Sequence, residues 1–504
     1  MRWGDTVAYW ARWQGDAIAV RFGERDLTWA LLDRHASAIA ASLQELGVER
    51  GDRVGLLMSN RPEFLEVVVA CARIGAIVAP FNLRFTAVEL AFVVGDADCS
   101  VVVTETALRD GLSLVEHDRS DLDIVDVDSQ RWPAMAARDA APQPVDVGDD
   151  DPFFICYTSG TTGHPKGAVL THRSWFYASM VRSLQGGINR NDRILLPFPL
   201  AFTGGLALAM VALWTGATLV LEQAFEPGRA LQLIESQRIT VFMAVPTLFQ
   251  LMAQHPTFAA TDISSIRCAS SGGAPVPVSL LQTFLDRGIT MTQTYSLTEV
   301  SASGITLPYH EAFARVGSCG VPAMHSQARI VDADGNELPP GTVGEIAIKG
   351  PEVMAGYWRN PEATAATLRD GWCHTGDLGT MDADGYFYVV DRAKDMLISG
   401  GLNVYPAEIE RELSGLDGIV ELAVIGVADE RWGETPAVIA VTDGRGLDGA
   451  TVLGRCAGRL ADFKLPRYLV VRPEPLPRNM SGKVLKAALR AEYADLPATA
   501  TPIR

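Results

Sequence analysis

Apolar residues in the first part of the chain occur in short runs that alternate between two periodicities. The runs at residues 52–58 and 76–80 are nearly continuous, which predicts buried strands. Between them, residues 62–74 repeat apolar positions at helical spacing, and a similar stretch runs from residue 28 to about 46. Strands that alternate with helices favour a mostly parallel sheet covered on both faces. Residues 1–150 are therefore predicted to form an α/β lobe.

The same alternation continues from residue 151 to about 320. Four further apolar runs predict short buried strands, at residues 194–198, 218–221, 241–244 and 266–270. Polar loops at residues 270–275 and 295–299 follow predicted strands. Ligands of open α/β sheets bind at the carboxyl ends of strands, so both loops are expected to line one pocket.

One uncharged stretch, residues 194–221, is long enough to cross a membrane. It is interrupted by breakers at Pro197, Pro199, Gly204, Gly205 and Gly216. Proline and paired glycines disfavour one continuous helix, so we interpret the stretch as strand, loop, helix and strand inside an α/β core.

The pattern changes near residue 321. Up to about residue 390 the runs alternate or are β-branched and are separated by Asp-Gly and Pro-Gly turns, which predicts an antiparallel sheet or a small barrel. Residues 391–395 follow, and four of these five side chains are charged. The remainder predicts a small α+β domain, with a helix near Pro406, strands near Ile419 and Val438, and a helix from about Thr451. We expect two domains, 1–392 and 393–504, with a hinge near 391–395.

Composition excludes several classes of protein. A formal net charge of −17 over 504 residues argues against a nucleic-acid surface and against a polybasic membrane anchor. The seven cysteines contain no C-x-x-C pair and the eight histidines have no metal-ligand spacing, so we expect reduced thiols and no structural zinc. The N-terminal residues lack the apolar core of a signal peptide. These features predict a cytoplasmic protein.

The densest chemical signal is the segment 157–167, which reads YTSGTTGHPKG. An apolar run at 153–156 precedes it, and a helix is predicted after Thr171. Glycines allow backbone N–H groups to close on an anion, the hydroxyls add donors and Lys166 adds charge, which suits a polyphosphate. The spacing is not that of the Gly-x-x-x-x-Gly-Lys-Ser/Thr loop, because Ala168 stands where the hydroxyl belongs. A flexible surface loop is the competing interpretation, although linkers rarely have this composition.

Four later motifs are each modest when taken alone. Glu299 can be an ordinary surface carboxylate, and Asp377, after Thr-Gly, can be a turn residue. Arg392 and Lys394 can belong to a solvated linker, and Lys483 can begin an ordinary helix. Their joint order along one chain is what changes their interpretation.

That ordered set resembles the adenylate-forming superfamily, which contains acyl- and aryl-CoA ligases, luciferases and the adenylation domains of peptide synthetases. The resemblance covers nearly the whole chain, from about Thr28 to Leu485. It is carried by residues 157–167, 295–299, 375–377, 391–395, 400–401 and Lys483. It implies a large N-terminal domain of layered α/β lobes with a small β-barrel-like lobe, and a small, mobile α+β C-terminal domain.

The resemblance implies a first step in which a carboxylate attacks the α-phosphate of ATP. Two anions meet there, so a cation has to lie between them and Mg²⁺ has to neutralise the departing pyrophosphate. Lys483 is implied to be that cation and Glu299 to hold Mg²⁺, with Thr298 and Thr158 beside the phosphates. The loop residues implied to grip the β- and γ-phosphates are Ser159, Gly160, Thr161, Thr162, Gly163 and Lys166.

The resemblance also implies which residues bind the ribose and the adenine of ATP. Asp377 is implied to accept hydrogen bonds from the ribose hydroxyls, with Arg392 beside it. Adenine is implied to lie between Tyr295, which stacks on it, and the small residues Gly272, Gly273 and Ala274, which allow a close approach.

The implied second step is attack of a thiol on the acyl-adenylate. In the superfamily the C-terminal domain rotates between the steps about a single Asp or Lys, and Lys394 matches that position. The rotation would withdraw Lys483 and bring Gly400 and Gly401 to the pocket, where small residues leave room for a phosphopantetheine arm. By resemblance to CoA ligases, Trp432 and Phe463 stack on the CoA nucleotide and Arg467 contacts its phosphate. An ordinary exposed aromatic pair is the competing interpretation.

The acid itself is not revealed. Many relatives have Tyr-Gly-x-Thr-Glu, where this chain has Ser296 in place of the glycine, and this change narrows the expected acyl channel. Phe202 is interpreted as an aromatic gate beside the acyl site. The expected pocket residues, Phe202, Met243, Ser296, Ser301 and Ser303, include no cation that suits a charged tail. A very long straight chain is disfavoured, and medium-chain, branched and aryl acids stay open.

We therefore predict an ATP- and Mg²⁺-dependent ligase that joins a small carboxylic acid to coenzyme A. A stand-alone adenylation enzyme that loads a carrier protein is an alternative, and so is a non-catalytic nucleotide sensor. The predicted partners are small molecules, with no nucleic acid and no transmembrane segment. The oligomeric state is left open, a homodimer included.

Overall fold

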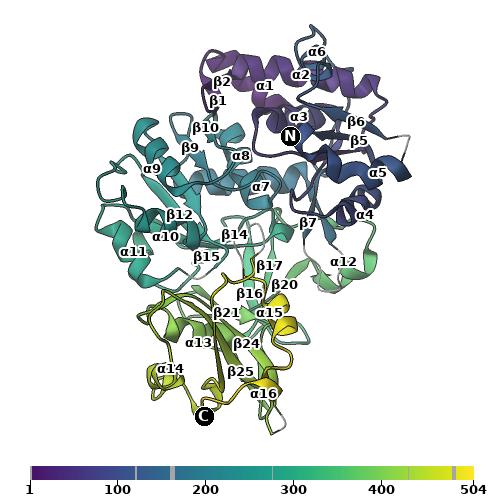
Figure 1. Cartoon of the computed structure of the whole chain (residues 1–504). Coiled ribbons are helices and arrows are strands. Elements are labelled where there is room, and N and C mark those ends of the chain that lie inside the picture. The colour runs from purple at the N-terminus through teal and green to yellow at the C-terminus, as the bar shows by residue number, and fades with distance from the viewer. Residues whose placement is uncertain (1–2, 120–121, 159–164, 275, 430, 479–483) are drawn as a thin grey trace.

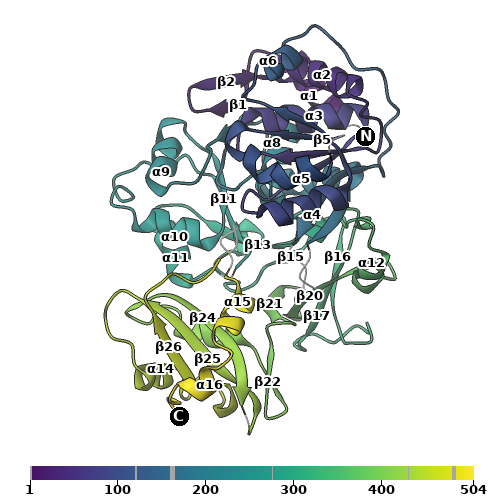
Figure 2. The same ribbon diagram turned by 45° about the vertical axis from the view of Figure 1, so that its right-hand side comes forward.

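The computed structural model describes residues 3–119, 122–158, 165–274, 276–429, 431–478 and 484–504. Figure 1 shows a large upper body, coloured purple to teal, and a smaller green-to-yellow part beneath it. The C-terminal part lies at the end of the molecule opposite helices α1 (Trp3–Gln14) and α2 (Trp29–Glu45) in both views (Figures 1 and 2).

A seven-stranded sheet forms the core of the first lobe, in the order β18-β8-β7-β4-β3-β5-β6. The strands β7, β4, β3, β5 and β6 are parallel, and β8 and β18 are antiparallel at one edge. Their bounds are β3 (Arg53–Leu57), β4 (Ile77–Pro80), β5 (Cys99–Thr104), β6 (Asp123–Asp126), β7 (Pro152–Thr158), β8 (Lys166–Thr171) and β18 (Gly356–Tyr357). The predicted strands at 52–58 and 76–80 are confirmed as β3 and β4.

A nine-stranded sheet forms the second lobe, in the order β15-β14-β13-β12-β11-β9-β10-β1-β2. Its six strands from β13 to β1 are parallel, which confirms the covered parallel sheet expected from the βα alternation. The bounds are β1 (Ile18–Phe22), β2 (Arg25–Thr28), β9 (Arg193–Leu196), β10 (Thr218–Leu221), β11 (Val241–Ala244), β12 (Cys268–Gly272), β13 (Met291–Ser296), β14 (Gly304–Thr306) and β15 (Val321–Pro322).

Helices cover these sheets and share one apolar core with them. Thr28 caps α2 by accepting a hydrogen bond from Leu31 N at 3.2 Å. Thr171 caps α7 in a reciprocal capping box with Ser174, as the sequence predicted. Besides α1 and α2, the main helices are α3 (Pro62–Ile74), α4 (Ala87–Ala97), α5 (Ser113–Asp118), α6 (Arg131–Ala136), α7 (His172–Gly186), α8 (Thr203–Thr215), α9 (Pro227–Ser236), α10 (Pro246–Gln254) and α11 (Val278–Leu285).

The uncharged stretch 194–221 folds as strand β9, helix α8 and strand β10, as expected from its breakers. Helix α8 is buried along almost its whole length, because it packs between the two large sheets rather than against solvent. Within the described ranges, helices that combine the length and apolar character of a membrane span are absent.

The segment 157–167, which the sequence predicted to bind phosphate, joins two strands. The sequence predicted a strand, the loop and then a helix after Thr171. The structure adds strand β8, which pairs antiparallel with β7 from Thr158 opposite Lys166 to Pro152 opposite Thr171. The strand was missed because its run begins inside the loop motif, at Lys166. Residues 159–164, which include Ser159, Gly160, Thr161, Thr162 and Gly163, lie outside the described residues.

Residues 321–390 form the predicted antiparallel sheet. Its order is β16-β17-β20-β19, with β21 paired to β20. The strands are β16 (Gln327–Val331), β17 (Gly344–Lys349), β19 (Leu368–Arg369), β20 (Trp372–Met381) and β21 (Phe387–Arg392), and α12 (Pro361–Thr367) precedes β19.

The C-terminal part has its own five-stranded sheet and its own apolar clusters. The helices and strands predicted near residues 406, 419, 438 and 451 are all present. The elements are β22 (Leu397–Ser399), β23 (Leu402–Val404), α13 (Pro406–Leu413), β24 (Ile419–Asp429), β25 (Gly433–Thr442), α14 (Gly449–Cys456), β26 (Tyr468–Arg472), α15 (Lys486–Glu492) and α16 (Leu496–Thr499).

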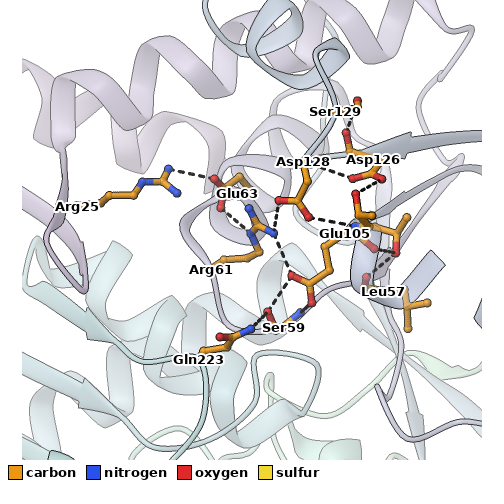
Figure 3. Close-up of polar contacts among 12 residues, drawn as sticks. Arg25, Leu57, Ser59, Arg61, Glu63, Glu105, Asp126, Asp128, Ser129 and Gln223 are labelled. Atoms are coloured by element: carbon orange, nitrogen blue, oxygen red, sulfur yellow. Dashed lines mark hydrogen bonds and ion pairs between the residues drawn. The ribbon is translucent and has the colours of Figure 1, made fainter. Parts of the chain in front are cut away.

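A charged cluster lies at the carboxyl ends of β3 and β5, as Figure 3 shows. Arg61 donates from Nε to Glu63 at 3.1 Å and from Nη1 to Glu105 at 3.0 Å, and it also pairs with Asp128 at 2.9 Å. Glu105 accepts two more hydrogen bonds from Ser59, at 3.2 and 3.0 Å. Each buried carboxylate therefore has a cationic partner, which offsets the cost of desolvation.

Asn60, between Ser59 and Arg61, connects the two large sheets. Its Nδ2 donates to the carbonyls of Phe198 and Glu222 at 2.8 and 3.1 Å, and its Oδ1 accepts from Leu200 N at 2.7 Å. The charged cluster fixes the backbone around Asn60. Asn60 in turn fixes the 198–200 segment, which leads into α8.

Replacing Arg61 with Met should lower the free energy of unfolding by about 3 kcal/mol at neutral pH, because Glu63 and Glu105 stay buried without their shared cation. Burial works to raise the pKa of Glu63, but its backbone contact and the guanidinium groups of Arg61 and Arg25 outweigh burial and lower that pKa. This contribution is present above the ordinary carboxyl pKa of about 4.3 and is lost as the pH falls through the folded value. The deficit of Arg61→Met in urea unfolding should therefore shrink below about pH 4.

The control for this experiment is Arg138→Met, which removes an exposed ion pair with Glu45. Solvent screens such pairs, so its unfolding curve should match that of the wild type. Equal destabilisation by both variants would contradict the structural role given to the Arg61 cluster.

Gly272 ends β12 so close to β13 that a side chain does not fit. A Cβ at this position would lie 2.6 Å from Thr294 Oγ1 and 2.7 Å from the Thr294 carbonyl oxygen. Gly272→Ala should therefore destabilise the protein by about 1–3 kcal/mol, the usual cost of overpacking, as measured by denaturant unfolding. Gly95→Ala, in helix α4 with open space around it, should instead stabilise by about 0.5–1 kcal/mol. A neutral Gly272→Ala would contradict the close approach of the two strands.

Candidate active site

A cavity of about 270 Å³ opens where β11, β12 and β13 end and α8 begins. Parallel strands bring their carboxyl ends to one edge of a sheet, which is where open α/β sheets bind ligands. The C-terminal part of α7 also contributes to the lining, through Arg182, Gln185 and Gly186. The cavity is thus built from elements of the second lobe, and the 198–200 segment held by Asn60 forms part of its wall.

One side of the cavity is apolar. Phe198, Phe202, Leu208, Met243 and Val245 contribute to it. Of the pocket residues expected from the sequence, Phe202, Met243, Ser296 and Ser303 border the cavity. Ser301 is buried outside the lining, and its Oγ donates to the carbonyl of Glu352 at 2.9 Å.

The other side is polar and leads towards the antiparallel sheet. Tyr295, Gly272 and Gly273 border it, and Ala274 follows them in an exposed position. The Tyr295 hydroxyl donates to Asp377 Oδ2 at 2.7 Å. Burial, with the nearby charge of Asp377, raises the pKa of Tyr295 well above its usual value, so the hydroxyl stays protonated as the donor.

Asp377 continues this link towards the hinge. Its Oδ1 lies 3.2 Å from Nε of Arg392, and the two residues are opposite each other in the pairing of β20 with β21. A line of contacts therefore runs from the cavity through Tyr295 and Asp377 to Arg392, two residues before Lys394. Lys394 is exposed.

Glu299 has a partner that the sequence did not reveal. The hydroxyl of Tyr357 donates to Glu299 Oε1 at 2.7 Å, and burial together with the charge of Glu299 raises the pKa of that hydroxyl. Strand β18 carries Tyr357 to the site by pairing with β8. A two-residue edge strand that joins a distant segment leaves no periodic signal in the sequence.

Tyr357 also brings the other predicted phosphate residues near Glu299. Lys166 Nζ lies 5.5 Å from the centre of the Tyr357 ring, and the Oγ1 of Thr158 donates to the Lys166 carbonyl at 3.3 Å. Thr298, beside Glu299, shares a hydrogen bond of 3.0 Å with Thr203 at the start of α8.

These residues fit a magnesium ion that is shared with a polyphosphate. Mg²⁺ is commonly bound through one or two carboxylates and substrate phosphates, and Glu299 supplies one fixed carboxylate beside several hydroxyls. Groups of three or more His, Cys, Asp or Glu that could cage a metal by themselves are absent from the described ranges. Among the described residues, Glu299 would therefore hold the ion together with a bound polyphosphate.

Five further predicted residues lie in the C-terminal part. Gly400 N donates to the Trp432 carbonyl at 2.8 Å, and a Cβ on Gly400 would lie 2.8 Å from the Trp432 ring. Trp432 N donates to Asp429 at 2.9 Å, and Arg467 pairs with the same carboxylate at 3.2 Å. Phe463 packs partly against the apolar core of this domain. Gly401 follows Gly400 in the turn between β22 and β23 with a φ of +82°.

Lys483 lies outside the described residues. The described chain resumes at residue 484, and Lys486 then pairs with Glu410 at 2.7 Å. Closer to the predicted hinge, Arg490 of α15 pairs with Asp395 at 2.6 Å.

Arg182 was also missed by the sequence analysis, which found no cation among the expected pocket residues. It is the only charged residue among the described residues that line the cavity. Its position on α7 resembles that of any surface arginine in the sequence, and its contact with the backbone of Ala302, in the loop after β13, holds it at the pocket.

Comparison with known proteins identifies the family. The family model of AMP-binding enzymes matches residues 7–358, and that of the AMP-binding enzyme C-terminal domain matches residues 408–483. Feruloyl-CoA synthase from Amycolatopsis sp is 41% identical over 96% of this chain and 97% of its own length. Indoleacetate–CoA ligase from Aromatoleum aromaticum is 39% identical over 94% of both chains.

Solved structures of related proteins agree with this family assignment. ATP-bound MatB from Rhodopseudomonas palustris is 33% identical and covers 98% of this chain and 100% of its own, with a TM-score of 0.90. The apo structure of the same protein, at the same identity and coverage, gives 0.80. This chain therefore superposes more closely on the ATP-bound form than on the apo form. The chain belongs to the AMP-binding enzyme family of adenylate-forming proteins, in its acyl- and aryl-CoA ligase branch, and is an AMP-forming acid–thiol ligase.

Proposed function

We propose that the cavity beside β13 is where the chain activates its acid and then forms the thioester. In the first step a carboxylate oxygen attacks the α-phosphorus of ATP, and pyrophosphate leaves. In the second step the CoA thiol loses its proton, its sulfur attacks the acyl carbon, and AMP leaves. The observation that carries this proposal is that one cavity has an apolar side for an acyl group and a polar side formed by Tyr295, Thr298 and the Asp377 link.

The nucleotide would occupy the polar side. Gly272 and Gly273 leave room for adenine against the backbone, and the Tyr295 ring can stack on it. Asp377 has one contact on each carboxylate oxygen, so each oxygen keeps a lone pair that can accept from a ribose hydroxyl. Arg392 orients this carboxylate through its contact with Oδ1.

The phosphates would lie between Glu299 and the loop after β7. When bound at Glu299, Mg²⁺ supplies charge neutralisation for the departing pyrophosphate. Tyr357 orients the Glu299 carboxylate, while Thr298, Thr158 and Lys166 face the same region from two strands. The loop residues 159–163 would add backbone donors.

Lys483 would bridge the attacking carboxylate and the α-phosphate. Attack of one anion on another is opposed by their charges, and a preorganised cation removes most of that barrier. This chain superposes more closely on the ATP-bound form of a relative than on the apo form of the same protein. That likeness supports an arrangement of the two domains that suits this first step.

The second step would use a rotation of residues 393–504 against residues 1–392 about Lys394. Rotation would carry Asp395 and Arg490 together, because both lie within residues 393–504. It would also bring the Gly400–Gly401 turn to the cavity. Trp432, 40% exposed beside that turn, then offers a stacking face for the CoA nucleotide, with Arg467 close to it through Asp429.

The acid would be medium-sized, branched or aromatic. A cavity of about 270 Å³ that is shared with the nucleotide does not suit a long straight chain. The named relatives act on feruloyl and indoleacetyl groups, both of which are aryl acids. We place the reaction in the cytoplasm, where CoA and ATP are both supplied.

The direct test is a panel of carboxylic acids with ATP and Mg²⁺, in which pyrophosphate release and thioester formation are measured with CoA and with a carrier protein. Thioester on CoA supports the proposal. Thioester on the carrier alone would favour a carrier-loading enzyme, and the absence of pyrophosphate with every acid would favour a nucleotide sensor.

Lys483→Ala should lower the rate of adenylate formation by about 10²–10³, the usual effect of losing one preorganised electrostatic contact. The same variant should still convert a supplied acyl-adenylate with CoA at the wild-type rate, because Lys483 would be withdrawn in that step. The control is Lys486→Ala, which removes a nearby lysine that pairs with Glu410. Equal loss in both half-reactions would refute the alternation of the domain.

Tyr357→Phe should raise the Mg²⁺ concentration needed for half-maximal pyrophosphate release by roughly tenfold, the lower end of what an orienting partner of a metal ligand contributes. The ring that lies against Lys166 stays, so the effect isolates the hydrogen bond to Glu299. Tyr388→Phe, which removes a hydrogen bond to Asp382 outside the cavity, is the control. An unchanged magnesium dependence in Tyr357→Phe would show that Tyr357 does not position the ligand.

A further inference from the structure

Among the described residues, a single cation lies in the wall of the cavity. Arg182 lies near the C-terminal end of α7, and Gln185, one turn further along the same helix face, also borders the cavity. The other described lining residues are apolar, small or hydroxyl-bearing. Within the described lining, positive charge is therefore confined to the α7 end.

Only some of the hydrogen-bond donors of the Arg182 guanidinium have a partner within the protein. Its Nη2 donates to the carbonyl of Ala302. Its Nη1 is buried and has no hydrogen-bond partner. Among the described residues, no carboxylate forms an ion pair with it, whereas Arg61 pairs with three acids.

Support of the neighbouring backbone explains only part of this arrangement. Ser301 and Ala302 both adopt left-handed conformations with φ of +53°, which cost energy in residues with a Cβ. The bond from Arg182 to Ala302 helps to hold them. A neutral donor such as glutamine serves that purpose equally well, so backbone support does not account for a buried positive charge.

The desolvated charge of Arg182 lowers the stability of the folded protein. Burial lowers the pKa of Arg182 to about 10, so the side chain stays protonated at neutral pH although it is desolvated. An unpaired buried charge destabilises a protein unless an ion of opposite sign compensates it. The described lining of the cavity contains no acidic residue, so an anion brought by the substrate would compensate this charge.

We propose that the acid carries a second anionic group at its far end, a carboxylate that Arg182 binds while the first carboxylate is activated. The preferred substrates are then dicarboxylic acids of small or aromatic frame, and Arg182 is the residue that selects them. Gln185 adds a neutral donor beside it. This inference rests on the proposed function, because it assumes that the same cavity holds the acyl group.

The geometry of Arg–carboxylate pairs determines how strongly the enzyme should prefer dicarboxylic acids. A bidentate pair in a desolvated site is strong and directional, and a site that is built for it rejects a ligand that leaves the cation unpaired. We therefore expect kcat/KM for a dicarboxylic acid to exceed that for its monoamide, or for the matched acid with a terminal methyl, by about 10²-fold.

The experiment measures pyrophosphate release from matched sets of acids: aliphatic and aromatic dicarboxylic acids, their monoamides and their methyl-terminated equivalents. In the wild type the dicarboxylic member of each set should be preferred. Arg182→Met should abolish this preference by raising KM for the dicarboxylic acids, while the methyl-terminated acids keep their rates or gain. Arg182→Lys, which keeps a charge without the planar fork, should retain part of the preference. Arg190→Met, which removes an exposed arginine that follows α7, should match the wild type.

Thermal unfolding separates selectivity from structural support. Arg182→Met should leave the ligand-free melting temperature unchanged or raise it, because an uncompensated charge has been removed. A lower melting temperature with an equal loss of activity for every acid would overturn the inference and make Arg182 a support for residues 301–302. A wild-type preference for the methyl-terminated acids would overturn it as well. If no acid in any set released pyrophosphate, adenylation itself would be refuted, which is a different failure from the loss of this selectivity.

Discussion

The site depends on the bond between Tyr295 and Asp377. Tyr295 belongs to the central sheet of the second lobe and Asp377 to the antiparallel sheet next to the C-terminal part, so this bond of 2.7 Å ties the two sheets together at the cavity. Because it is buried, its loss would leave a carboxylate without one of its partners in a desolvated position. The polar residues of the cavity, the Asp377 carboxylate and the segment that leads to residues 391–395 are positioned relative to one another through it.

Much of this architecture could be predicted because the relevant signals are local. Strands β3 and β4 and helix α3 follow from runs and periodicities within a few residues, and Thr171 caps α7 as its sequence position indicates. The carboxyl-end loops after β12 and β13 were expected to share a pocket because parallel strands end at one edge of a sheet, and residues of both border the same cavity. The ordered motifs identified the family.

The features that were missed depend on contacts between distant segments. Tyr357 reaches Glu299 only because the two-residue strand β18 pairs with β8. Neither strand has a sequence pattern from which this pairing could be predicted. Arg182 lies on a helix whose polar positions look solvent-exposed in sequence, and its burial results from how α7 packs against the loop that follows β13. Strand β8 was hidden because Lys166 serves both as a motif residue and as the first residue of a strand. Tertiary packing, rather than local propensity, decides each of these cases.

The ion pair between Asp395 and Arg490 has a consequence for how the enzyme responds to its medium. Both side chains are only partly buried, at 12% and 30% exposure, so dissolved ions reach the pair and weaken it. Both groups lie within residues 393–504, so the pair ties the residue that follows Lys394 to helix α15 of the same domain. Added salt would loosen that attachment, and any rotation about the proposed pivot would then carry the domain less well as one body.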